Sequence, residues 1–129
     1  MEEQEEKEYK IEDAEANSDN KEFMMKALDD NTAWVLAYAS EKLLADRELI
    51  LKAVKVDGQI LYYASKELRD DKEVVLEAVN NKGLILKYAS KRLRANRDIA
   101  EAAVANDKRA LGYISDEALK EELSKEEEN

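Results

Sequence analysis

The sequence predicts an all-α protein made of tandem helical-hairpin repeats of about 25 residues, a short α-solenoid. The chain of 129 residues has no proline and only three glycines, whereas a β-rich fold usually needs more turn-forming residues. Apolar residues recur at helical spacing. The repeat itself is visible every 25 residues in three identical tripeptides and a degenerate fourth: Tyr38-Ala39-Ser40, Tyr63-Ala64-Ser65, Tyr88-Ala89-Ser90 and Tyr113-Ile114-Ser115.

The repeats predict one domain at residues 20–119, with copies near 20–44, 45–69, 70–94 and 95–119. The net charge of −10 comes from the flanking segments, because residues 21–119 hold 17 acids and 17 bases. Residues 1–19 and 120–129 are acidic and poor in apolar residues, so we expect both to be disordered or frayed tails.

The first half of each unit is predicted to be a helix that starts at an amide-capping residue. These caps are Asn20, Asp46, Asp71 and Asn96, and an acid follows two positions later in each copy. Apolar residues then fall on one helical face. Gly58 and Gly83 stand where a left-handed residue would end this helix.

The second half of each unit is predicted to be another helix, which runs to about Leu68-Arg69 or Leu93-Arg94. The serine of each tripeptide is an alternative break, which would leave a helix followed by a short turn. The four recurring tyrosines share a face with leucines, so we expect them to pack in the core with hydrogen-bonded hydroxyls. Substitutions in the fourth copy, such as Lys108 for glycine, are typical of a terminal capping repeat.

The string from Asn81 to Arg94, with its glycine and its Tyr-Ala-Ser, resembles a tandem helical repeat family known as a domain of unknown function (family 4116). The string from Asp71 to Val79 is similar to the same family. The resemblance covers residues 20–119. It implies a repeat fold, and it brings no catalytic motif.

The composition argues against an enzyme. Histidine and cysteine are both absent, which removes the commonest general base and the usual zinc ligands. The glycines are too far apart for a phosphate-binding loop. We therefore expect no catalytic residues, no metal and no cofactor. An acidic N-terminus and the lack of a long apolar run predict a cytoplasmic protein without a membrane segment.

Positions that the repeat does not fix are the best candidates for a binding site. In the second halves these positions lie three, four and three residues apart, which would place them on a single helical face. The candidate partner-binding residues are Trp34, Tyr62, Lys66, Arg69, Leu84, Lys87, Lys91 and Arg94.

Charge gives this face a possible partner class. Residues 82–97 contain six basic side chains and no acid, which predicts a basic patch with aromatic edges. Our first hypothesis is a protein–protein interaction module, an adaptor or a small inhibitor or effector, whose partner is a protein that could be acidic. It would be a monomer or a weak homodimer. The alternatives are nucleic acid or a phosphate ligand on the patch, which the acidic tails disfavour, and a structural or engineered array without a dedicated partner.

Overall fold

A computed structural model describes residues 8–127, and that part of the chain is helical without any strand. Short 3₁₀ helices (η) alternate with α-helices. In chain order the elements are α1 Ile11–Ala16, α2 Lys21–Asp29, η1 Ala33–Tyr38, α3 Glu41–Leu44, α4 Arg47–Val56, η2 Gly58–Tyr62, η3 Leu68–Asp70, α5 Lys72–Asn81, η4 Gly83–Tyr88, α6 Lys91–Arg94, α7 Arg97–Asn106, η5 Lys108–Tyr113 and α8 Glu117–Glu127.

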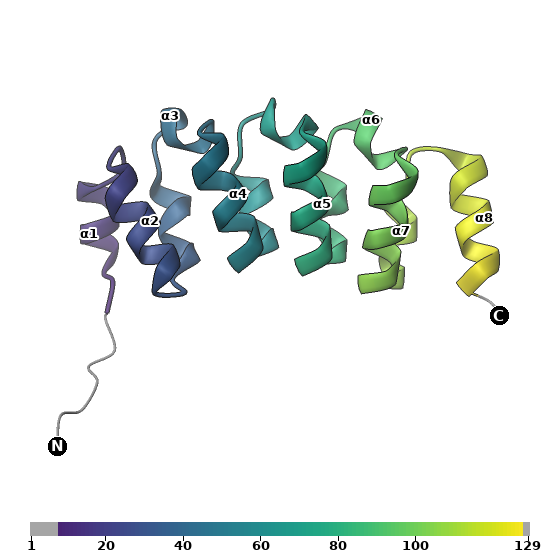
Figure 1. The fold of residues 1–129 in the computed structure, drawn as a ribbon, viewed down its shortest axis with the longest axis horizontal. Helices are drawn as coiled ribbons and strands as arrows, with labels where there is room; N and C mark the ends of the chain where they lie inside the picture. Colours follow the sequence, from purple (N-terminus) through teal and green to yellow (C-terminus); the bar gives the residue numbers. More distant parts are fainter. Residues whose placement is uncertain (1–7, 128–129) are drawn as a thin grey trace, which may run out of the picture.

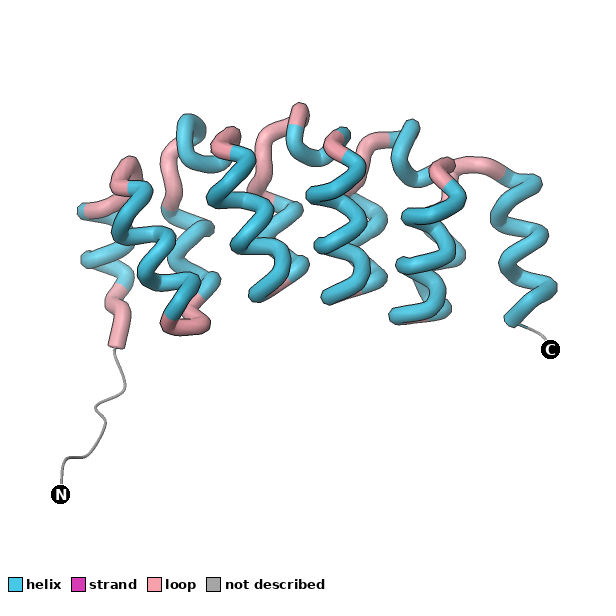
Figure 2. The backbone as a smooth tube through the Cα atoms, viewed as in Figure 1, coloured by secondary structure: helices cyan, strands magenta, loops and turns pink. Residues whose placement is uncertain are grey.

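The elements form two layers of a short solenoid (Figure 1). Helices α2, α4, α5 and α7 stand side by side in one layer, which α8 extends. Helices η1, η2, η4 and η5 stand behind them, and the short turns α3 and α6 join the layers at one edge (Figure 2). Each unit therefore buries its apolar face against the next unit, as the repeat predicts.

The predicted caps of the first helices are confirmed. The side chains of Asn20, Asp46, Asp71 and Asn96 each accept a hydrogen bond from a backbone N–H three residues later. The residue after each cap is basic and reaches an acid of the next unit. This ladder joins Lys21 to Asp46, Arg47 to Asp71, Lys72 to Asp98 and Arg97 to Glu122, at distances of 2.9, 2.7, 2.9 and 2.5 Å.

The second halves differ from the predicted α-helices. They are 3₁₀ helices of five or six residues, and the chain breaks at the Tyr-Ala-Ser tripeptides, as the alternative held. Ser40 and Ser90 then cap the short α3 and α6 by accepting the N–H of Leu43 and of Leu93, both at 3.2 Å. A polar hydroxyl at this point competes with continuation of the helix.

The predicted left-handed conformation of Gly58 and Gly83 is wrong, because no glycine has a positive φ. Glycine is required instead by a close approach between units. A Cβ at Gly83 would lie 2.3 Å from the carbonyl oxygen of Ala103, and one at Gly58 would lie 2.5 Å from that of Ala78.

An asparagine of the next unit completes each of these contacts. The Gly58 N–H donates to Asn81 Oδ1 at 2.7 Å, and the Gly83 N–H donates to Asn106 Oδ1 at 2.6 Å. Each asparagine also donates to a carbonyl of the preceding first helix. Ala33 replaces the glycine in the first unit, and Val56 replaces the matching asparagine in the second, so glycine and asparagine occur together or not at all at the three junctions.

The expected tails are partly ordered, and they cap the array. Helix α1 packs beside η1 with Ala14 fully buried, and the Tyr9 ring meets the Phe23 ring edge-on at 5.7 Å. At the other end α8 runs through residues 120–127 and buries Leu119 and Leu123. These apolar residues offset the entropy of ordering that we expected to prevail. Residues 1–7 and 128–129 lie outside the described part of the chain.

The core is apolar throughout the described residues, without a buried polar or charged side chain. The expectation that all four repeat tyrosines join it is wrong. Tyr38 and Tyr63 are each 36% exposed, whereas Tyr88 and Tyr113 are half-buried against the core. Within residues 8–127 none of the four hydroxyls makes a hydrogen bond to another part of the protein, and each ring is at least partly exposed.

Candidate functional site

The predicted site residues do not share one helical face, because the break at Tyr-Ala-Ser divides them. Trp34, Tyr62, Leu84 and Lys87 lie on the 3₁₀ helices η1, η2 and η4. The other four lie in the turns at the edge of the array: Lys66, Arg69, Lys91 and Arg94. The structure therefore separates the candidates into an η-layer group and an edge group.

Two members of the η-layer group, Trp34 and Tyr62, lie within an aromatic band, which we define as Trp34, Tyr38, Tyr62, Tyr63 and Tyr88. Trp34 meets Tyr38 edge-on at 6.1 Å, and Tyr62 meets Tyr63 at 5.0 Å. Tyr62 also reaches the next unit, where its ring meets Tyr88 edge-on at 4.9 Å. The side chains of Trp34 and Tyr62 remain 41% and 51% exposed.

An open depression of about 430 Å³ adjoins the band between η4 and η5, and we call it the η4–η5 depression. Tyr88 belongs to both the band and the depression. The ammonium of Lys87 lies 4.9 Å from the centre of the Tyr88 ring, a cation–π geometry. The full lining is Gln59, Lys82, Leu84, Ile85, Lys87, Tyr88, Asp107 and Arg109.

One residue of the edge group, Arg94, has a structural contact. Arg69 and Arg94 are half-buried. The Arg94 Nη1 donates to the carbonyl of Tyr113 at 3.2 Å, so this guanidinium joins two units. We therefore remove Arg94 from the candidate docking residues, and keep the half-buried Arg69 together with Lys66 and Lys91, which are exposed.

Ion pairs and one carbonyl bond occupy most cations of the predicted basic patch 82–97. Arg92 lies 3.0 Å from the Asp70 carboxylate, Arg97 pairs with Glu122 across 2.5 Å, and Lys82 lies 4.0 Å from Asp57. Only Lys87 and Lys91 of the six cations have neither an acid partner nor a carbonyl bond from their side chains within residues 8–127. The patch is thus much less basic than its sequence suggests.

Two carboxyl groups near these cations have a lowered pKa because they accept hydrogen bonds from charged or polar neighbours. The Ser90 hydroxyl and the Arg92 guanidinium lower the pKa of Asp70, and Arg109 lowers the pKa of Asp107. Neither group is held in its protonated form, as a general acid would require. Their role is to bind neighbouring cations.

Comparison with models of known protein families shows which family the chain belongs to. The family model described as Domain of unknown function (DUF4116) matches residues 20–69 and again residues 71–120. The chain belongs to the DUF4116 family. Neither the curated proteins nor the solved structures gave a match.

Each DUF4116 match covers two of the 25-residue units, and both matches begin at or beside a first-helix cap. The aromatic band therefore crosses the boundary between the two DUF4116 copies, with Tyr62 in the first and Tyr88 in the second. Helix α1 and most of α8 flank the matched residues as caps.

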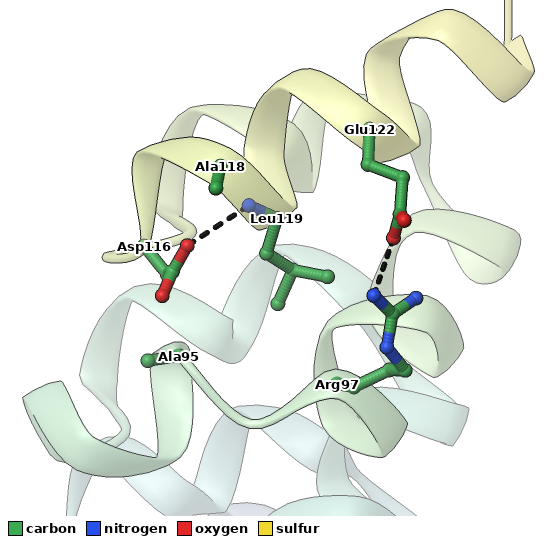
Figure 3. Close-up of a pocket in the computed structure, with 6 residues that line it drawn as sticks. All are labelled: Ala95, Arg97, Asp116, Ala118, Leu119 and Glu122. Atoms are coloured by element: carbon green, nitrogen blue, oxygen red, sulfur yellow. Dashed lines mark hydrogen bonds and ion pairs between the residues drawn. The ribbon is translucent and has the colours of Figure 1, made fainter.

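Two other depressions of this DUF4116 protein are less suited to binding. One of about 450 Å³ lies at the edge turns, where Asp70 already holds Ser90 and Arg92. The other, of about 280 Å³, lies between the start of α7 and α8 (Figure 3). There Arg97 pairs with Glu122, and the Asp116 carboxylate accepts a hydrogen bond from the backbone N–H of Leu119. Each of these charged groups therefore already has a partner.

The described residues hold no cluster of three or more potential metal ligands. None of their helices combines the length and the apolar character needed to cross a membrane. Sequence reasoning missed Tyr38 and Tyr63 as surface residues, because their invariance across units favoured a core role. Their neighbours Trp34 and Tyr62 were the available signal, since large rings at variable positions rarely serve packing alone.

Proposed function

We propose that this DUF4116 protein is a non-enzymatic protein–protein interaction module, an adaptor or a small inhibitor or effector, that docks its partner on the aromatic band. The observation that carries the proposal is the exposure of Trp34 and Tyr62, at 41% and 51%, beside other surface rings. Tyrosine and tryptophan are enriched in the energetic centres of protein interfaces. A rigid two-layer array presents these rings with little loss of entropy on binding.

The aromatic band is also pre-organised for binding. Its rings are held by one another in edge-to-face contacts, so their orientation is set before a partner arrives. Lys87 covers one face of Tyr88 and provides a charged rim. Apolar contact at the centre and charge at the rim together are typical of a specific interface.

Nucleic acid remains the weaker alternative for this surface. Bases stack on exposed aromatic faces, and phosphates need a surplus of unpaired cations nearby. Here the rings pack edge-on against one another, and the cations Lys82, Arg92 and Arg97 already face acids. These contacts favour a protein partner.

Affinity capture from cells that make the protein tests the proposal. The baits are the wild type, a Trp34→Ala/Tyr62→Ala variant and an Ile11→Ala control, which removes a 49%-exposed apolar side chain outside the band. We expect one protein to be retained by the wild type and the control and lost from the double variant, with equal helical content in all baits. The proposal fails if the double variant retains every captured protein. Loss of the captured material on nuclease treatment would favour nucleic acid.

The proposal includes a cytoplasmic location and a monomeric or weakly dimeric state. Cell fractionation tests the first, and light scattering tests the second against the chain mass of 14.7 kDa.

A further inference from the structure

We infer that the partner presents an acidic side chain beside an aliphatic one, and that the η4–η5 depression binds this pair. This inference rests on the proposed function and specifies the partner's chemistry. The inference follows from the residues that line the depression, and from the fact that Arg109 is already paired with an acid whereas Lys87 is not paired with one within the described residues.

The depression is charged at its rim and apolar at its floor. Lys82, Lys87 and Arg109 contribute three cations, whereas Asp107 is the one acid in the lining. Ile85 is buried beneath it, and Leu84 is a half-buried aliphatic side chain at a position that the repeat does not fix. An incoming group would therefore meet positive charge and an aliphatic surface together.

Asp107 is already occupied and does not neutralise the whole rim. Its carboxylate accepts from the Arg109 backbone N–H at 3.0 Å, from Arg109 Nε at 3.0 Å and from Arg109 Nη2 at 2.7 Å. Lys87 has only the Tyr88 ring, at 4.9 Å, as its partner among the described residues. A carboxylate that approached Lys87 would complete this site without displacing an existing pair.

A peptide carboxylate fits this site better than a phosphate. Phosphate is usually held by several donors together, such as a guanidinium fork, convergent backbone N–H groups or a lysine acting with them. The fork of Arg109 is engaged by Asp107. Leu84 instead offers contact to an aliphatic neighbour of the acid, and Tyr88 connects the depression to the aromatic band. A protein chain can fill both surfaces at once.

Selection from a phage-displayed library of random 12-residue peptides tests the inference. The baits are the wild type, Lys87→Glu, Trp34→Ala/Tyr62→Ala, and Lys66→Glu as a matched control, because Lys66 is an exposed lysine of the edge turns. We expect the wild type and Lys66→Glu to enrich peptides with Asp or Glu next to Leu, Ile or Val. We expect Lys87→Glu to enrich Lys or Arg at the same place, because the charge at the site is reversed.

Fluorescence anisotropy with the most enriched peptide gives the magnitude. Replacing its acid by the matching amide should weaken binding roughly three- to tenfold, the range of a partly exposed ion pair. Enriched peptides that lack an acid but depend on Trp34 and Tyr62 would overturn this inference and leave the proposed function standing. Peptides retained by the Trp34→Ala/Tyr62→Ala bait would overturn the proposed function, and failure of every bait to enrich a peptide would overturn both.

Discussion

The backbone of Gly83 lies so close to the next unit that no side chain fits between them. A Cβ there would meet a carbonyl oxygen at 2.3 Å and a backbone nitrogen at 3.1 Å, and neither can move without shifting α7. Gly112 is the natural contrast, because nothing lies within 4 Å of a Cβ built on it and its φ is not positive. Two glycines of one chain therefore have opposite tolerance for a methyl group.

We predict that Gly83→Ala destabilises the protein by about 1–3 kcal/mol, the usual cost of overpacking. Gly112→Ala should be neutral or stabilise it by up to about 1 kcal/mol, because alanine restricts the unfolded chain. Urea denaturation followed by circular dichroism measures both. Equal midpoints for the two variants would show that the close approach at Gly83 does not exist in solution.

For single residues, the sequence predicted the helix caps correctly and the conformation of Gly58 and Gly83 wrongly. A cap is a local feature, because Asp71 and the N–H of Val74 are three residues apart. The need for Gly58 and Gly83 comes from a neighbouring unit more than 20 residues away. The sequence still held a signal of this contact, because Gly58 is accompanied by Asn81 and Gly83 by Asn106 at the same spacing.

In the second and third units, one row of buried residues in the second half repeats at a period of three, which favours a 3₁₀ helix. Gly58, Leu61 and Ala64 are buried, as are Gly83, Leu86 and Ala89. An α-helix would rotate such residues off one face, whereas a 3₁₀ helix keeps them aligned. This period was readable in the sequence, but short apolar runs fit both helix types. The same error merged the edge residues and the η-layer residues into one predicted face.

The ion-pair ladder along the first helices makes stability depend on pH. Arg47 lowers the pKa of Asp71 below its ordinary value of 3.8, and Lys72 lowers that of Asp98. A carboxyl whose pKa is lowered by folding stabilises the native state above its unfolded pKa, and this contribution is lost as the pH falls through the lowered value. We therefore predict a plateau of stability at neutral pH and a decrease below about pH 4.

Replacing Arg47 by Met removes its ion pair with Asp71 and so measures what this pair contributes to stability. The variant should lose less stability than the wild type on acidification, because Asp71 then titrates nearer its ordinary pKa. Thermal denaturation from pH 7 to pH 2 measures the difference, and added salt should reduce it. Parallel pH profiles for the two proteins would exclude a contribution from this pair.

Helix α8 caps the array through two leucines, although its sequence is mostly charged. Leu123 is 3% exposed, so Leu123→Ala should cost about 2–5 kcal/mol if the cap unfolds together with the neighbouring units. Ala118→Ser, at an exposed position of the same helix, should change the free energy of unfolding by less than about 1 kcal/mol. Hydrogen exchange read by mass spectrometry would also show faster exchange in η5 of the Leu123→Ala variant. Unchanged protection in η5 would mean that α8 does not cap it.

Across the whole molecule, the charges and the exposed rings are used differently. Several cations of the array join one unit to the next, whereas the aromatic band joins units and still faces solvent. The repeat, its period and its family could be predicted from the sequence, because each depends only on which residues recur at a fixed spacing along the chain. The arrangement of the candidate site could not, because the pairing of cations in residues 82–97 with acids distant in the sequence depends on how the chain packs.

Site-specific photo-cross-linking tests the central claim most directly. A benzophenone side chain placed at Tyr62 in the η layer, or at Lys55 on the exposed side of α4, would be activated in cells that make the protein. We predict one dominant cross-linked protein from position 62 and none above background from position 55. The same cross-links from both positions, or none from position 62 while the protein is folded, would contradict a docking function for the aromatic band.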